Sequence, residues 1–280
     1  SLVSIIIFIN YEKIHCTKLG DLFFDKLLGL NSNCYERKKK GVINPSVENL
    51  GTRYLYVENK KLVKCPQNSM IIIVSGQSNS ANFLKSFKKY KNNHYNYFEG
   101  KCYALSNPVL GAEGEMSSIA PAIAENLNIF ENIIFITSGR GGYSIVKNDN
   151  KSFINYNVRA LNELKKKNNY LRFFVWIQGE SDIGNSNEYE KSFERIYQTI
   201  LDTQKNKKNI ELIITQTTRC KNVEDKLLRD VQKAISLSKN NTLEVINTDN
   251  LGNEFRYDDC HFNSRGLDTH ALKWVKIISS

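Results

Sequence analysis

Five short apolar runs, each rich in β-branched or aromatic residues, recur from residue 70 onward and alternate with longer amphipathic stretches. Runs of this length predict buried strands, and the stretches between them predict helices. Strands are expected at 70–74, 133–137, 172–177, 211–215 and 243–247, with helices near 118–128, 153–167, 188–203, 223–238 and 264–277. Because strands alternate with helices, the pattern predicts a three-layer α/β/α sandwich around a mostly parallel five-stranded sheet.

The first 66 residues lack this alternation, so we expect them to form an accessory region, with the main domain at 67–280. Two short extended runs, at 53–57 and 61–64, flank a polar turn and suggest a hairpin. The apolar stretch at 1–9 is too short to span a bilayer. It suits either the end of a clipped signal sequence or a buried strand, and no other segment is expected to cross a membrane.

The composition of the 280 residues, 41% hydrophobic and 24% charged, excludes a disordered chain. The 39 Lys and Arg residues against 29 Asp and Glu give a net charge of +10, which favours anionic partners. The basic residues are nevertheless spread over short runs mixed with Asn. A nucleic-acid surface would concentrate them on one element, so no nucleic-acid partner is expected.

The chain has six scattered cysteines, and none forms a CxxC pair: Cys16, Cys34, Cys65, Cys102, Cys220 and Cys260. The spacing favours neither a zinc site nor a thioredoxin-like redox site, and we expect no bound metal. Up to three disulfides or buried free thiols are equally compatible with the count. Neither the compartment nor the oligomeric state follows from these features.

The polar segments after each predicted strand are informative, because parallel sheets bind ligands beyond the carboxyl ends of their strands. The first strand is followed by SGQSN at 75–79, which puts Ser78 in a tight strand-to-helix turn where a hydroxyl is exposed. The second is followed by the glycine-rich segment 138–144 and the third by QGESD at 178–182. Segment 138–144 fits neither the Walker pattern nor the dinucleotide fingerprint, so a phosphate loop is not expected.

Near the C-terminus, Asp258 precedes His261 by three residues, just before the last predicted helix. At this spacing a turn lets Asp258 accept the Nδ1 hydrogen of His261 and leaves Nε2 free to take a proton from a serine. None of the other three histidines is preceded by an aspartate at this spacing. Asp258 and His261 are therefore candidate partners of Ser78.

Four segments together resemble the SGNH hydrolases: GQSN at 76–79, GGYSI at 141–145, WIQGESD at 176–182 and DDCHF at 258–262. Within that superfamily the chain is similar to the sialate O-acetylesterase group and to the acetyl xylan esterases of carbohydrate esterase family six. The resemblance covers about 200 residues from Met70 onward, and the four segments match in order and in their position at strand ends.

The resemblance implies a flavodoxin-like SGNH hydrolase fold and a serine esterase that removes acetyl groups from a carbohydrate, such as sialic acid or xylan. It makes Ser78 the nucleophile and His261 the general base. Asp258 then orients His261, with Asp259 as the second choice. No metal or organic cofactor enters this chemistry.

The resemblance also implies an oxyanion hole that includes the backbone N–H of Ser78 and the side-chain amide of Gln178. A third donor comes from Gly111 or Gly114, and Gly114 is preferred. Arg140 is expected to reach a carboxylate such as that of a sialic acid. Substrate contacts are expected from Gln77, Asn79, Arg140, Gly142 and Glu180. Segment 141–147 lacks the tryptophan usual in the family, so no sugar preference is transferred.

Two other functions are compatible with these residues. The acetyl-enzyme could pass its acetyl group to a sugar hydroxyl, which would make the protein a carbohydrate O-acetyltransferase. The same fold could instead bind a glycan without catalysis, because a fold does not dictate its function. The intact set of serine, histidine, aspartate and amide argues against the second alternative.

Overall fold

The computed structural model describes residues 57–127, 131–148, 150–239 and 245–279. The apolar stretch at 1–9 and the first run of the expected hairpin, up to residue 56, lie outside these ranges. The predicted accessory region is therefore described only in its last ten residues.

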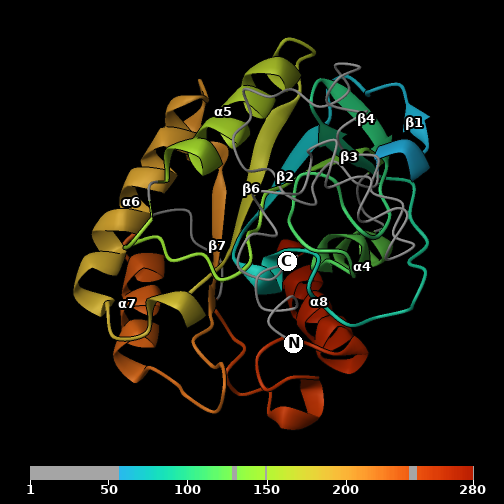
Figure 1. The fold of residues 1–280 in the computed structure, drawn as a ribbon. Helices are drawn as coiled ribbons and strands as arrows, with labels where there is room; N and C mark the ends of the chain where they lie inside the picture. Colours follow the sequence, from blue (N-terminus) through green and yellow to red (C-terminus); the bar gives the residue numbers. More distant parts are fainter. Residues whose placement is uncertain (1–56, 128–130, 149, 240–244, 280) are drawn as a thin grey trace, which may run out of the picture. The chain divides into compact units, whose positions relative to one another are not determined.

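One mixed sheet runs through the described residues, with the strand order β1-β4-β3-β5-β2-β6-β7-β8 (Figure 1). The strands are β1 (Leu62–Val63), β2 (Met70–Gly76), β3 (Tyr95–Phe98), β4 (Lys101–Ala104), β5 (Ile133–Thr137), β6 (Tyr170–Ile177), β7 (Glu211–Gln216) and β8 (Ile246–Asn247). The five predicted strands are β2, β5, β6, β7 and β8, and neighbouring members of this set pair in parallel. Every residue of β2 is buried, as expected for a central strand that is covered on both faces.

The predicted five-stranded sheet is too small, because β1, β3 and β4 extend it at one edge. Strands β3 and β4 form an antiparallel hairpin, and its two turn residues, Glu99 and Gly100, have φ values of 45° and 82°. Positive φ at both positions matches the twist of the strands that such a turn joins. Strands β3 and β4 are not predictable from the apolar pattern, because each has only four residues, with polar positions among the apolar ones.

Five α-helices in the described ranges cover the two faces of the sheet (Figure 1). Helices α5 (Lys151–Lys165), α6 (Ser186–Asp202) and α7 (Lys226–Leu237) lie on one face, and α4 (Ile119–Asn126) and α8 (Ser264–Ile278) on the other. Successive residues of β2 divide between the two cores: Ile71 and Ile73 belong to the first, and Ile72 and Val74 to the second. The three layers expected from the alternating pattern are present.

Residues 57–66 contribute to the β1 edge of this sheet. Strand β1 pairs with β4, and a disulfide joins Cys65 to Cys102 in β4. The second run of the expected hairpin thus pairs with β4. In the described part of the chain, none of the helices has the length and apolar character that a membrane crossing requires.

Candidate active site

The candidate nucleophile lies in the turn after β2. Gly76 has a φ of 136°, and a Cβ at this position would overlap the carbonyl of Ile177 in β6, so the close approach of the two strands requires glycine. The N–H of Gln77 donates to the same carbonyl at 2.9 Å. Ser78 follows, with 3% of its surface exposed, and opens the short 3-10 turn Ser78–Ser80. This 3-10 turn stands where the sequence predicts the start of a helix.

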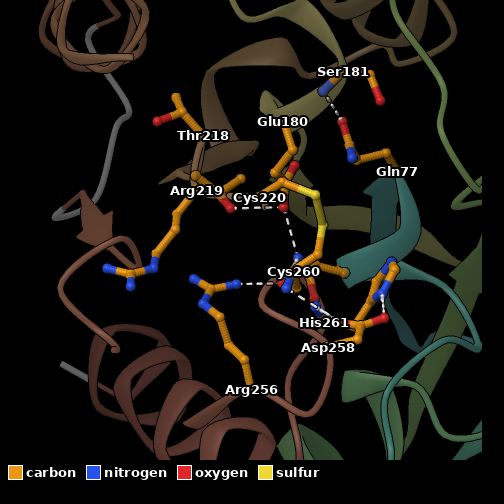
Figure 2. The surroundings of a disulfide bond; sticks show 12 residues. Gln77, Glu180, Ser181, Thr218, Arg219, Cys220, Arg256, Asp258, Cys260 and His261 are labelled. Carbon is orange, nitrogen blue, oxygen red and sulfur yellow. Dashed lines mark hydrogen bonds and ion pairs between the residues drawn. A yellow bond between two sulfur atoms is a disulfide. The ribbon is translucent and has the colours of Figure 1, made fainter. Parts of the chain in front are cut away.

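The loop before α8 carries the second half of the candidate site. His261 Nδ1 lies 2.7 Å from Asp258 Oδ2, while Asp258 Oδ1 accepts two backbone N–H groups of the same loop (Figure 2). Burial acts to raise the pKa of Asp258, but these hydrogen bonds outweigh it and hold the pKa below its usual range. The imidazole lies beside the rings of Phe83 and Tyr257, with centroids 5.8 and 5.9 Å away. With Nδ1 engaged by Asp258, Nε2 is the ring nitrogen left for another partner.

Asn79 joins the serine turn to the histidine loop. Its Nδ2 donates to the carbonyl of Cys260 at 3.2 Å, and its Oδ1 accepts the N–H of Phe262 at 3.4 Å. Cys260 and Phe262 flank His261, and Asn79 directly follows Ser78, so these contacts bring the two segments together. In the described ranges, no hydrogen bond joins Ser78 Oγ to the His261 ring.

Gln178 follows β6 as the sequence predicts, but both hydrogens of its amide are in use. Its Nε2 donates to the carbonyl of Tyr143 at 3.0 Å and to the carboxylate of Asp182, and the residue is fully buried. Asp182 also accepts from Ser144 Oγ and from the N–H of Ile145. The Gln178–Asp182 pair thus fixes the glycine-rich segment, and this amide has no hydrogen left for another acceptor.

The other glutamine of this region, Gln77, has the opposite orientation. Its Oε1 accepts the N–H of Ser181 at 3.0 Å (Figure 2). The same oxygen accepts the N–H of Gly179 at 3.4 Å. Because both partners are donors, the amide orientation is defined, and among the described residues Nε2 has no hydrogen-bond acceptor. Gln77, for which the sequence predicts a substrate contact, thus places a second side-chain amide next to Ser78 in the chain.

The two candidate glycines of the oxyanion hole occupy different surroundings, although both have positive φ. A Cβ at Gly111 would overlap the Thr137 carbonyl and the Tyr156 hydroxyl, so Gly111 packs beneath the end of β5. Gly114 forms a parallel bridge with Asn82, four residues after the nucleophile. The position of Gly114 beside the nucleophile segment favours it over Gly111.

Arg140 and Gly142 lie on the segment after β5. The N–H of Arg140 donates to the Gly76 carbonyl at 3.1 Å, which anchors this segment to the nucleophile turn. The Arg140 guanidinium lies over the ring of Tyr143, 5.4 Å from its centroid. Gly142 has a φ of 59°, and a Cβ there would meet open space. The backbone of Arg140 therefore adjoins the nucleophile turn, and the contact of its side chain with a substrate carboxylate stays a prediction.

Glu180 was expected to contact substrate, yet its carboxylate is turned inward. Its Oε1 accepts from Asn79 Nδ2 at 2.6 Å and from Thr217 Oγ1 at 2.9 Å, and only 7% of the residue is exposed. Burial raises the pKa of Glu180 above its usual range, against the effect of these hydrogen bonds. This contact between Glu180 and Asn79 links the QGESD segment to the serine turn.

The serine turn and the histidine loop, joined through Asn79, carry a serine hydroxyl, an imidazole–carboxylate pair and side-chain amides. These are the kinds of group that acyl transfer requires. Within the described residues, no group of three or more His, Cys, Asp or Glu side chains is arranged to hold a metal ion.

Comparison with known proteins gives one family and several similar structures. Residues 68–277 match the family model described as carbohydrate esterase, sialic acid-specific acetylesterase. A solved structure of a protein from Arabidopsis thaliana is similar, with 15% identity, a TM-score of 0.61 and coverage of 77% of this chain and 99% of that chain. NanS is similar with 13% identity and a TM-score of 0.51, over 78% of this chain and 98% of that chain. At these identities the likeness concerns the fold alone. No curated protein matches the sequence.

Proposed function

Since the chain belongs to the carbohydrate esterase family of sialic acid-specific acetylesterases, we propose that it removes O-acetyl groups from a carbohydrate through an acyl-enzyme on Ser78. One observation carries the proposal: Asn79, next to Ser78, hydrogen-bonds to both residues that flank His261. The contact of the His261 ring with Asp258 supports the role of His261 as general base.

The reaction proceeds by two acyl transfers. His261 Nε2 takes the Ser78 proton as Oγ attacks the acetyl carbonyl, and Asp258 stabilises the imidazolium that forms. The sugar alcohol leaves with a proton from His261, and the acetyl group remains on Ser78. Water, deprotonated by His261, then attacks the acetyl-serine and releases acetate. The hydrogen bond between Ser78 and His261 forms in the substrate complex, because catalytic contacts commonly tighten when substrate binds.

The oxyanion hole combines the backbone N–H groups of Ser78 and Gly114 with a side-chain amide. Gln178 was the predicted amide, but its hydrogens are committed to Tyr143 and Asp182, so we favour Gln77 Nε2. Replacing the true donor with alanine should lower kcat roughly 10²- to 10³-fold. Gln77→Ala and Gln178→Ala, compared in one assay with their thermal stabilities, separate the two assignments.

An O-acetylated sialic acid is the substrate that this site suits best. Its carboxylate can pair with the guanidinium of Arg140, a residue whose backbone N–H is bonded to the nucleophile turn. Acetylated xylan offers no equivalent group on its backbone sugars. Arg140→Gln should therefore raise KM for an O-acetylated sialic acid and leave the hydrolysis of p-nitrophenyl acetate unchanged.

The test is acetate release by purified protein from O-acetylated sialic acids and from acetylated xylan. Ser78→Ala should abolish release, while Ser264→Ala, an exposed serine at the start of α8, should match the parent. Undiminished activity in Ser78→Ala would refute the proposal. Adding an acceptor sugar separates hydrolysis from acetyl transfer, because a transferase would form a newly acetylated sugar in place of free acetate.

A further inference from the structure

The position of His261 depends on what holds its loop, because the residue lies in irregular backbone between η6 (Asn253–Phe255) and α8. A disulfide joins Cys260, directly before His261, to Cys220 in the loop after β7 (Figure 2). The two Cα atoms are 4.1 Å apart. This covalent link, one residue from the imidazole, restricts the positions that His261 can adopt.

The Cys220 end of the disulfide is itself well held. Cys220 and Val223 exchange two backbone hydrogen bonds of 3.0 Å. Just upstream, the buried carboxylate of Asp249 accepts the N–H groups of Thr218 and Arg219, each at 2.9 Å. The disulfide therefore ties the histidine loop to a segment with several anchors of its own.

Cys260 is also the point where two hydrogen bonds from buried side chains converge. Its carbonyl accepts from Asn79 Nδ2 and from the Arg256 guanidinium. Glu180 joins these groups, since its carboxylate accepts from the same Asn79 Nδ2 and from Thr217 Oγ1 at the end of β7. The positive charge of Arg256 attracts the Glu180 carboxylate. The ends of β2, β6 and β7 thus meet the histidine loop at Cys260.

We propose that the Cys220–Cys260 disulfide and Glu180 are positioning elements that keep the His261 ring aligned with Ser78. The proposal rests on the esterase function proposed above. Neither element touches the reacting atoms, so both act through the loop. Their effect on the rate is expected to be large, because a misplacement of about 1 Å can lower a rate roughly 10²-fold.

The second disulfide, Cys65–Cys102, is a matched control. The two disulfides join residues 40 and 37 positions apart, so their removal should destabilise the fold similarly. We expect the double variant Cys220→Ser/Cys260→Ser to lower kcat about 10- to 100-fold, with KM within about threefold of the parent. The double variant Cys65→Ser/Cys102→Ser, assayed at a temperature where it is folded, should keep kcat within about twofold.

A reducing agent gives an independent form of the same test. Reduction should lower the kcat of the parent and of Cys65→Ser/Cys102→Ser, and should leave Cys220→Ser/Cys260→Ser unchanged. An equal loss of kcat in the two double variants, or a parent-like kcat in Cys220→Ser/Cys260→Ser, would overturn the role of the disulfide.

Two substitutions separate positioning by Glu180 from a direct role of its charge. Glu180→Gln keeps an oxygen that can accept from Asn79 and Thr217, so kcat should stay within about threefold of the parent. Glu180→Ala removes that acceptor, and kcat should fall about tenfold with little change in KM. If Glu180→Gln lost as much activity as Glu180→Ala, the positioning role would be wrong.

Amide hydrogen exchange tests the restraint without reference to activity. Residues 256–263 should exchange faster in Cys220→Ser/Cys260→Ser than in Cys65→Ser/Cys102→Ser. If the parent released no acetate, the proposed function would fail, and this measurement would still report on the loop. Unchanged exchange in residues 256–263 would overturn the inference even in an active enzyme.

Discussion

His270 makes the stability of the fold sensitive to acid. The ring is fully buried in α8, 5.3 Å from the ring centroid of Phe262 and 5.7 Å from that of Trp274. Neither ring nitrogen has a hydrogen-bond partner among the described residues. Burial, with smaller effects from the charges of Lys273 and Arg256, lowers the pKa of His270 from 6.5 to about 3. Phe262 directly follows His261, so this packing also supports the candidate catalytic loop.

The sign and size of the effect follow from proton linkage. Above pH 6.5 the ring is neutral in both the folded and the unfolded chain, and it contributes no pH dependence. As the pH falls below 6.5, the unfolded chain binds a proton that the folded protein rejects, so folding loses stability until the pH nears 3. Each pH unit in this window lowers the free energy of unfolding by about 1.4 kcal/mol, so at about pH 5 the protein has lost about 2 kcal/mol of stability.

Guanidinium denaturation of the parent and His270→Leu at about pH 7.5 and pH 5 measures this loss. The free energy of unfolding of the parent should fall by about 2 kcal/mol more than that of the variant. The difference between the two proteins cancels the titration of the carboxylates, which they share. Trp274→Phe, which alters the same packing and keeps the histidine, should retain the pH dependence of the parent. If His270→Leu showed the same pH dependence as the parent, His270 would not be a buried neutral ring.

Three further substitutions probe the site and its frame. Asp258→Asn should lower kcat roughly 10³- to 10⁴-fold with little change in the thermal midpoint, because the imidazole loses the group that orients it. Steady-state kinetics and a melting curve measure the two quantities, and a loss of kcat under tenfold would contradict the role of Asp258. Asp182→Ala removes the buried acceptor of Gln178, Ser144 and Ile145, and should lower the free energy of unfolding by about 3 kcal/mol or more. Chemical denaturation measures this loss, and a loss below about 1 kcal/mol would contradict the structural role of Asp182. Gly76→Ala should destabilise the fold by about 2 kcal/mol or more, since the added Cβ meets the Ile177 carbonyl at an unfavourable φ; a parent-like melting temperature would refute this reason for the glycine.

The sequence by itself determined the central part of the fold, the carbohydrate esterase family and the pairing of Asp258 with His261. Apolar runs predicted β5 at 133–137 as the structure has it, and the α/β class is confirmed. The segment resemblance predicted a carbohydrate esterase, and the family comparison confirms it at that level. These features are readable because burial on both faces of a strand produces a continuous apolar run, and because Asp258 and His261 are local in the chain.

Only the tertiary structure decided how the ends of separate strands meet. The pairing of Cys220 with Cys260, the commitment of the Gln178 amide to Tyr143, and the contact of Asn79 with the histidine loop each join residues 35 or more positions apart. The edge strands β3 and β4 belong to the same class, because their other neighbours in the sheet, β5 and β1, pair with them at separations of 39 or more positions. Such contacts depend on which distant segments lie together in the folded chain, and the pattern of apolar and polar residues within a short segment does not predict them.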